Sequence, residues 1–158
     1  EIRPRDWSSD VCSSDLNLSR IVGNILYKKH CIYRFAPTDV VLSEVDVVQP
    51  DLFIVCDRKK ITEKNIQGAP DVIFEILSPS TSRKDRWEKH ALYEKFGVKE
   101  YVILDPEGNY VERYVLGEDG LFDKGEVLGK TDTLQLKYLP EIVIPLEEVF
   151  AWELEERV

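Results

Sequence analysis

The sequence predicts a single α/β (α+β) domain in which a central mixed β-sheet is flanked by helices. Its 158 residues are 43% hydrophobic and 32% charged, which is enough for one hydrophobic core but too short for two ordinary domains. The expected elements follow one another as a helix, several strands, a second helix and several more strands. Residues 71–77, Asp-Val-Ile-Phe-Glu-Ile-Leu, are almost continuously apolar, as is typical of a strand covered on both faces.

Residues 1–16 are expected not to belong to the natural protein. Read in one frame, a common index adapter of short-read sequencing translates residue for residue into positions 6–16, Asp-Trp-Ser-Ser-Asp-Val-Cys-Ser-Ser-Asp-Leu. An ordinary polar tail is the alternative interpretation. The sequence has no Met, which agrees with a natural start lost before Asn17. We therefore leave residues 1–16 out of the expected fold and treat 17–158 as a single domain truncated at its N-terminus.

The elements of the first half follow from periodicity and turn residues. Apolar residues recur at helical spacing over 17–29, which predicts an amphipathic helix. The β-prone segments 31–35 and 39–42 are separated by Ala-Pro-Thr, which predicts two strands joined by a turn. A further strand region covers 47–56, where Pro50 marks an edge or an irregularity.

The second half begins with a helix whose two ends are marked in the sequence. Ser82 and Asp85 have the spacing of an N-cap, and Gly97 is a C-terminal stop, so we expect a helix over 83–96. A hairpin follows, and Gly117, Gly120, Gly125 and Gly129 are interpreted as turn glycines because they lack phosphate-loop spacing. The remaining expected segments are strands at 134–136 and 140–145 and a solvated acidic helix within 146–158.

Composition narrows the class of protein. The net charge of −9, or −7 without residues 1–16, argues against a passive nucleic-acid coat protein but not against a local basic site. No apolar stretch is long enough for a membrane helix, so no membrane partner is expected. The cysteines lack paired spacing, so we interpret Cys31 and Cys56 as core thiols and expect a cytoplasmic protein.

Two carboxylates are candidates for chemistry. Asp51 follows Pro50 in a strand region, and Glu75 interrupts an otherwise apolar strand, where burial of a charge is costly without a partner. One interpretation is a buried ion pair or a carboxylate that accepts backbone hydrogen bonds. The other is that Asp51 and Glu75 share a divalent cation such as Mg²⁺, which one or two carboxylates hold together with water and substrate phosphate.

Four basic residues occupy the first two turns of the helix after Glu75, where the helix dipole favours acids: Arg83, Lys84, Arg86 and Lys89. They are either a solvated face, with Asp85 and Lys89 as a pair, or a phosphate-binding surface in which one lysine points back toward Glu75. Trp87, Tyr93 and Phe96 are expected to pack in the core rather than to stack on bases. His30 and His90 are interpreted as surface or packing residues.

Several blocks of sequence resemble the Uma-two family of the PD-(D/E)XK, or restriction-endonuclease-like, superfamily. They are residues 49–57, Gln-Pro-Asp-Leu-Phe-Ile-Val-Cys-Asp, residues 68–81, Gly-Ala-Pro-Asp-Val-Ile-Phe-Glu-Ile-Leu-Ser-Pro-Ser-Thr, positions 85–89 with Tyr93, residues 97–101, and Asp105-Pro106. The resemblance covers 17–150. It implies a restriction-endonuclease-like core and Mg²⁺- or Mn²⁺-dependent hydrolysis of a nucleic-acid phosphodiester, with DNA as the expected substrate. By analogy it also allows a homodimer that cuts two strands.

The resemblance also implies roles for single residues. Asp51 matches the first metal-binding acid and Glu75 the second. The superfamily lysine two positions later is replaced by Leu77, so the basic role moves to Lys89, with Lys84 as the second choice. Glu44 and Asp71 are secondary acidic candidates, Asp71 being the more structural because it begins a strand. Arg83, Lys84 and Arg86 are expected to contact nucleic acid.

A catalytically inactive binding or assembly module on the same fold is the alternative function. The acidic net charge and the lack of a recognisable DNA-reading element favour it. A positive rim around Glu75 would support the nuclease, whereas pairing of all four helix cations with neighbouring acids would support the module.

Overall fold

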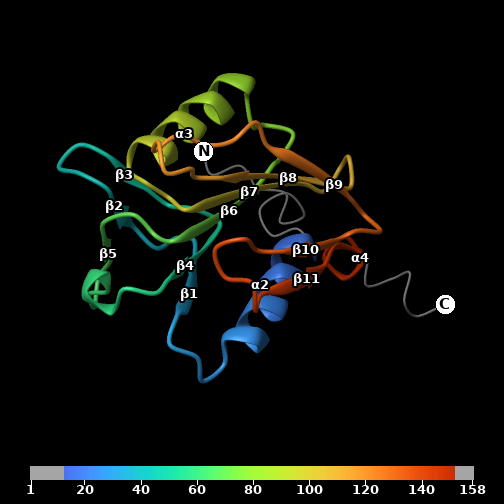
Figure 1. The fold of residues 1–158 in the computed structure, drawn as a ribbon, viewed down its shortest axis with the longest axis horizontal. Helices are drawn as coiled ribbons and strands as arrows, with labels where there is room; N and C mark the ends of the chain where they lie inside the picture. Colours follow the sequence, from blue (N-terminus) through green and yellow to red (C-terminus); the bar gives the residue numbers. More distant parts are fainter. Residues whose placement is uncertain (1–12, 152–158) are drawn as a thin grey trace, which may run out of the picture.

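A six-stranded mixed sheet forms the centre of the structure, a computed structural model that describes residues 13–151 (Figure 1). Its strands, in order across the sheet, are β1 (Ile32–Phe35), β4 (Leu52–Val55), β6 (Val72–Ile76), β7 (Glu100–Asp105), β8 (Tyr110–Val115) and β9 (Glu126–Gly129). β6 and β7 are parallel, and the other neighbours are antiparallel. The predicted class, a mixed sheet flanked by helices, is confirmed.

Helices cover both faces of this sheet. α3 (Arg83–Lys95), which connects the parallel strands β6 and β7, lies on one face, and α2 (Ser13–Leu26) lies on the other (Figure 1). The smaller elements are β2 (Val40–Val41), β3 (Val47–Val48), η1 (Arg58–Lys60), β5 (Ile66–Gln67), β10 (Thr133–Gln135), β11 (Val143–Pro145) and α4 (Leu146–Val149). They form a three-stranded sheet β3-β2-β5 and a β10-β11 ribbon beside α2 and α4.

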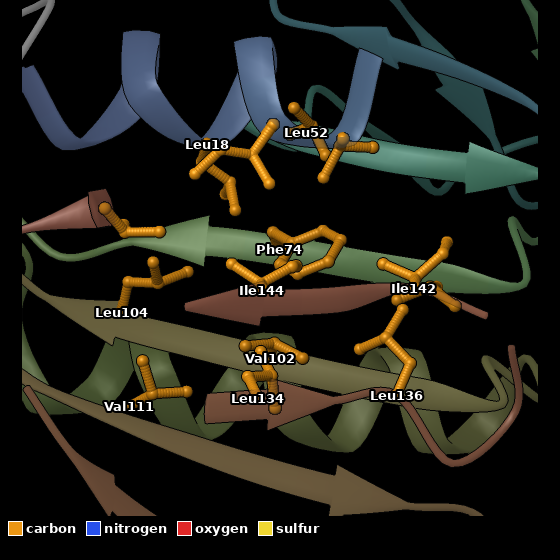
Figure 2. Packing of buried hydrophobic residues seen from close by; sticks show 14 of the residues in the cluster. Leu18, Leu52, Phe74, Val102, Leu104, Val111, Leu134, Leu136, Ile142 and Ile144 are labelled. Atoms are coloured by element: carbon orange, nitrogen blue, oxygen red, sulfur yellow. The ribbon is translucent and has the colours of Figure 1, made fainter. Parts of the chain in front are cut away.

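Alternation along the central strands divides the core into two layers, because successive side chains in a strand point to opposite faces. Phe74 of β6 packs with Leu18 of α2 and Leu52 of β4 in one cluster, which Figure 2 shows together with Ile144. Ile73, its neighbour in β6, belongs to the other cluster with Tyr93 of α3. Odd-numbered positions of β4 and β6 therefore face α3, which places Glu75 on the α3 side.

The helix and strand ends agree with the expected signals in most places. Ser82 and Asp85 form a reciprocal capping box at the start of α3, and Gly97 after the helix has a φ of +79°. The region 47–56 is split at Pro50 into β3 and β4, as the proline predicts. β9 is an element we expected as a turn, and its end at Gly129 pairs with Tyr110.

One prediction about particular residues is wrong, and one helix begins earlier than expected. Cys31 and Cys56 form a disulfide across the ends of β1 and β4, so they are not core thiols, and the cysteines no longer support the cytoplasmic prediction. α2 begins at Ser13, inside the segment that the adapter interpretation excludes, and Ser14 is buried. Residues 152–158 of the expected acidic helix lie outside the described part of the chain.

A buried charged pair ties the sheet to the C-terminal ribbon. Glu100, fully buried at the start of β7, accepts hydrogen bonds from the backbone N–H groups of Lys137 and Tyr138 at 2.8–3.1 Å. Arg113 of β8 lies 3.8 Å from the Glu100 carboxylate, and it also donates to the Gln135 carbonyl and pairs with Glu126. Each charge is thus compensated, as buried charges must be.

No helix in the described residues has the length and apolar character that crossing a bilayer requires.

Candidate active site

The sheet brings Asp51 and Glu75 to one place. β4 and β6 are antiparallel, with Leu52 opposite Phe74, and one further step in the same register sets Asp51 opposite Glu75. Directly opposed residues of an antiparallel pair have Cβ atoms about 5 Å apart. The backbone N–H of Ile76 donates to Asp51 Oδ2 at 2.7 Å, which fixes the Asp51 carboxylate against β6.

α3 supplies two partners for Glu75. Lys89 Nζ lies 3.0 Å from Glu75 Oε2, and Tyr93 donates its hydroxyl to Glu75 Oε1 at 2.8 Å. Lys89 and Tyr93 are four residues apart, so they lie on the same helix face, as the sequence predicts. Because α3 returns over the sheet between β6 and β7, this face lies above the end of β6. Asp51, Glu75 and Lys89 are thus brought together, and their chemical roles stay predictions.

Burial dominates the electrostatics of Glu75. The residue is 6% exposed, and burial raises the pKa of its carboxyl to about 7, an increase to which the negative charge of Asp51 adds. The positive charge of Lys89 and the hydrogen bonds from Tyr93 and Lys89 oppose this increase. Burial, together with the Glu75 carboxylate, also raises the pKa of Tyr93, which keeps the phenol protonated and therefore a donor.

The raised pKa predicts that Glu75 weakens the fold at high pH. Its pKa is about 7 in the folded protein and about 4.5 when unfolded, so protonated Glu75 favours folding fully below pH 4.5, and this contribution is lost as the pH rises through 7. We expect Glu75→Gln to be more stable than the native sequence above pH 7, by a difference on the order of 3 kcal/mol that vanishes toward pH 4.5. Urea unfolding of both proteins from pH 4.5 to 9 measures it. A difference in unfolding free energy that stays constant from pH 4.5 to 9 would contradict the raised pKa of Glu75.

A cavity of about 190 Å³ opens above these groups. Besides Asp51, Glu75 and Lys89, its lining includes Gln49, Thr81, Arg86 and Tyr101. Counted over side-chain atoms alone, Lys89 is 42% exposed and Glu75 is 8% exposed, so the cation lies toward the solvent side of the carboxylate. The cavity therefore presents two carboxylates at its base with a lysine and an arginine in its wall.

The other basic residues of α3 have different surroundings. Lys84 pairs with Glu88 at 3.7 Å on the exposed surface and does not line this cavity, which leaves Lys89 as the lysine beside Glu75. Arg86 donates to Glu112 of β8 at 2.7 Å. Three of the four helix cations are thus paired, and among the described residues Arg83 makes no ion pair. A positive rim of unpaired cations would have supported the nuclease, and pairing of all four cations would have supported the binding module. The observed pairing of three cations matches neither pattern.

The secondary acidic candidates lie away from the cavity. Asp71 is at the opposite end of β6, where its Oδ2 accepts the backbone N–H of Cys56 at 2.7 Å. Its carbonyl also accepts hydrogen bonds from Lys99 and Glu100, which agrees with the structural interpretation. Glu44 is exposed in the turn between β2 and β3 and does not line the cavity.

Asp15, which the sequence analysis did not consider, is close enough to Asp51 for their charges to interact. It lies in the first turn of α2, within the excluded segment 1–16. Burial raises its pKa to about 6, and the negative charge of Asp51 adds to the increase. The helical periodicity of 17–29, extended backward by one turn, was the signal that could have placed it near the sheet.

Among the aromatic candidates, the packing prediction is confirmed for Tyr93 and wrong for Trp87. Tyr93 is fully buried, whereas Trp87 is 68% exposed. His90 packs edge-on against Tyr114, with ring centroids 4.7 Å apart, as a packing residue does. Trp87 is six residues before Tyr93 in α3, so the two side chains do not share a helix face.

The donor set suits a hard divalent cation. Asp51 and Glu75 offer carboxylate oxygens, and Mg²⁺ is bound through one or two carboxylates with water and substrate phosphate completing its shell. The described residues contain no group of three or more His, Cys, Asp or Glu side chains arranged to hold a metal by themselves. Two carboxylates facing each other in a solvent-connected cavity therefore fit a site completed by water and phosphate.

Comparisons with known proteins agree on the class. A family model described as "Uma2: Putative restriction endonuclease" matches residues 12–147. Among solved structures, the chain resembles that of a putative nuclease belonging to DUF820 from Anabaena variabilis ATCC 29413, with a TM-score of 0.73 and 17% sequence identity. That match covers 89% of this chain and 79% of the other, and at this identity it shows the fold. No curated protein matches the chain.

Proposed function

The chain belongs to the Uma2 family of putative restriction endonucleases, and on this basis we propose that it is a metal-dependent endonuclease that hydrolyses phosphodiester bonds of nucleic acid. The observation that carries the proposal is Glu75. It is a carboxylate with a strongly raised pKa at the base of a cavity, opposite Asp51 and bonded to a lysine. Perturbed carboxylates beside a specific charged partner in a cleft are typical of functional sites.

The roles follow from position. Asp51 and Glu75 would hold Mg²⁺ or Mn²⁺, and a metal bound there lowers the pKa of a water ligand and polarises the phosphate. Lys89 Nζ places a positive charge beside the same oxygens, where it stabilises the charge that develops on the attacked phosphate. Tyr93 donates a hydrogen bond to Glu75 Oε1 and so fixes the orientation of the carboxylate, while Glu75 Oε2 would bind the metal.

Three finer properties are part of the proposal. DNA is the proposed nucleic acid, because the family description names restriction endonucleases. The proposed site of action is the cytoplasm, where that substrate would lie, and a homodimer would allow two strands to be cut. Arg86 is the proposed phosphate contact, because it lines the same cavity as Asp51 and Glu75.

The binding or assembly module remains the second candidate, because three of the four helix cations are already paired with acids. A module that binds without cleaving would leave Lys89 as a structural partner of Glu75. The two functions differ in their response to metal and to removal of Lys89.

Nicking of supercoiled plasmid with Mg²⁺ or Mn²⁺ tests the proposed function. We expect the native chain to nick the plasmid and Lys89→Met to be at least about 100-fold slower, because one preorganised charge at the transition state has about this effect. Lys64→Met, which removes an exposed lysine from the turn before β5, is the matched control and should keep full activity.

Absence of nicking by the folded native protein with both metals would contradict the nuclease and favour the module. Equal rates for Lys89→Met and Lys64→Met would remove Lys89 from the proposed mechanism. Circular dichroism of each variant establishes that the fold is intact before activity is compared.

A further inference from the structure

A second, larger cavity adjoins the candidate active site. It has a volume of about 450 Å³ and lies between α3 and the β8–β9 hairpin, with Ile103 of β7 in its lining. Arg86 lines this cavity and also the cavity that contains Asp51 and Glu75. The two cavities are therefore neighbours that share one arginine in their common wall.

Aromatic side chains provide much of the lining. Trp87, His90 and Tyr114 all face this cavity, and Trp87 and His90 pack edge-on with ring centroids 6.3 Å apart. His90 in turn packs against Tyr114 and Phe122, which holds it in place. Trp87 has no such cover, since 68% of its surface is exposed. A large exposed indole at the edge of a pocket with fixed aromatic walls offers a flat surface on which a planar group can stack.

Three basic and two acidic side chains contribute to the lining of this cavity, so its charge is slightly positive. Arg83 lies one helical turn before Trp87, and Lys124 belongs to the loop before β9; both are exposed and line the cavity. The two acids in the lining, Glu112 and Asp123, both accept hydrogen bonds from within the protein. Glu112 accepts hydrogen bonds from Arg86 and Tyr114, and Asp123 Oδ1 accepts the backbone N–H of Gly125. Arg83 and Lys124 make no ion pair among the described residues, so their charges can interact with phosphate groups.

We propose that this cavity binds an unpaired nucleobase of the substrate, stacked on Trp87, next to the phosphate that Arg86 presents to Asp51 and Glu75. The inference rests on the proposed function and specifies its substrate as single-stranded or locally unpaired nucleic acid. Aromatic side chains combined with a basic groove are the usual means of holding single strands without sequence preference. The volume lies within the range of about 300 to 1,000 Å³ found for small-molecule pockets, which accommodates a nucleoside.

A base inside a double helix cannot enter such a cavity. Its faces are covered by neighbouring base pairs, so it must leave the stack before an aromatic side chain can contact it. The cavity is a recess between a helix and a hairpin, whereas a duplex presents a convex surface. Access therefore favours single strands, loops and ends.

Binding of a labelled oligonucleotide tests this inference separately from cleavage. Fluorescence anisotropy at low salt, in the Glu75→Gln background, compares a 12-nucleotide single strand with the duplex of the same sequence. Trp87→Ala should weaken single-strand binding about 5- to 100-fold, the effect of removing one stacking platform, and Trp87→Phe should restore most of it. Tyr27→Ala, which removes an equally exposed aromatic residue just after α2, should have no effect.

The outcomes separate the two proposals. If Trp87→Ala weakens single-strand binding and leaves duplex binding within twofold, the base site is supported even when plasmid nicking fails. If Trp87→Ala binds single strands as well as the parent does, or weakens single-strand and duplex binding equally, the base site is overturned even when the protein nicks DNA. Tight binding of a free nucleotide monophosphate without binding of the oligonucleotide would also overturn it.

Discussion

Glu75→Gln is expected to abolish metal-dependent cleavage, with a rate at least about 1,000-fold below that of the native chain. The substitution keeps the size and the hydrogen bond from Tyr93 but removes one of two proposed metal-binding carboxylates. Loss of a bound metal removes several kcal/mol of transition-state stabilisation, and each 1.4 kcal/mol is a factor of ten in rate. Single-turnover cleavage with saturating Mn²⁺ measures the loss.

The same variant should be more stable than the native protein above pH 7, because a buried carboxylate with a raised pKa is removed. Loss of activity together with a gain of stability distinguishes a functional carboxylate from a structural one. Glu63→Gln, an exposed position in the turn before β5, is the control and should change neither property. A Glu75→Gln protein that cleaves at the native rate would contradict the proposed role of Glu75 in metal binding.

Glu100→Ala is expected to cost about 3 to 5 kcal/mol of unfolding free energy, the usual effect of removing one member of a buried charged pair. It would leave Arg113 without this buried partner and the backbone N–H groups of Lys137 and Tyr138 without acceptors. Burial already raises the pKa of Glu100 despite these backbone donors, so the site depends on complete compensation. Chemical denaturation of the native and variant proteins gives the difference.

Glu126→Ala is the matched control for Glu100→Ala. Glu126 is the half-exposed second partner of Arg113, and exposed ion pairs contribute about 1 kcal/mol or less. A Glu100→Ala variant within about 1 kcal/mol of the native protein would show that the buried network does not hold the β10–β11 ribbon to the sheet.

The sequence was informative wherever a single residue broke a local pattern. Glu75 stood out because it interrupts an apolar strand, and the basic first turns of α3 stood out because they oppose the helix dipole. Ser82, Asp85 and Gly97 predicted both ends of α3 through local hydrogen bonding and backbone conformation. These signals depend only on residues that are close in the sequence, so they can be recognised without knowledge of the fold.

The features that the sequence did not predict depend on contacts between segments that are far apart in the chain. Spacing along the chain does not determine that β4 pairs with β6, and this pairing sets Asp51 opposite Glu75. The same holds for Arg86 and Glu112, 26 residues apart, and for the disulfide between Cys31 and Cys56. Trp87 was misjudged because its aromatic residue type favours burial, whereas its actual exposure depends on which segments pack against α3.

Titration calorimetry with Mn²⁺ tests the central claim, that Asp51 and Glu75 together hold a divalent cation. Because the metal binds the ionised carboxylate and the pKa of Glu75 is about 7, binding should release protons below pH 7 and almost none at pH 9. Titrations in buffers of different ionisation enthalpy count these protons. We predict one site in the native protein, with this proton release, that is lost in both Asp51→Asn and Glu75→Gln. Mn²⁺ binding that persists in both variants, or no binding by the folded native protein, would contradict the account.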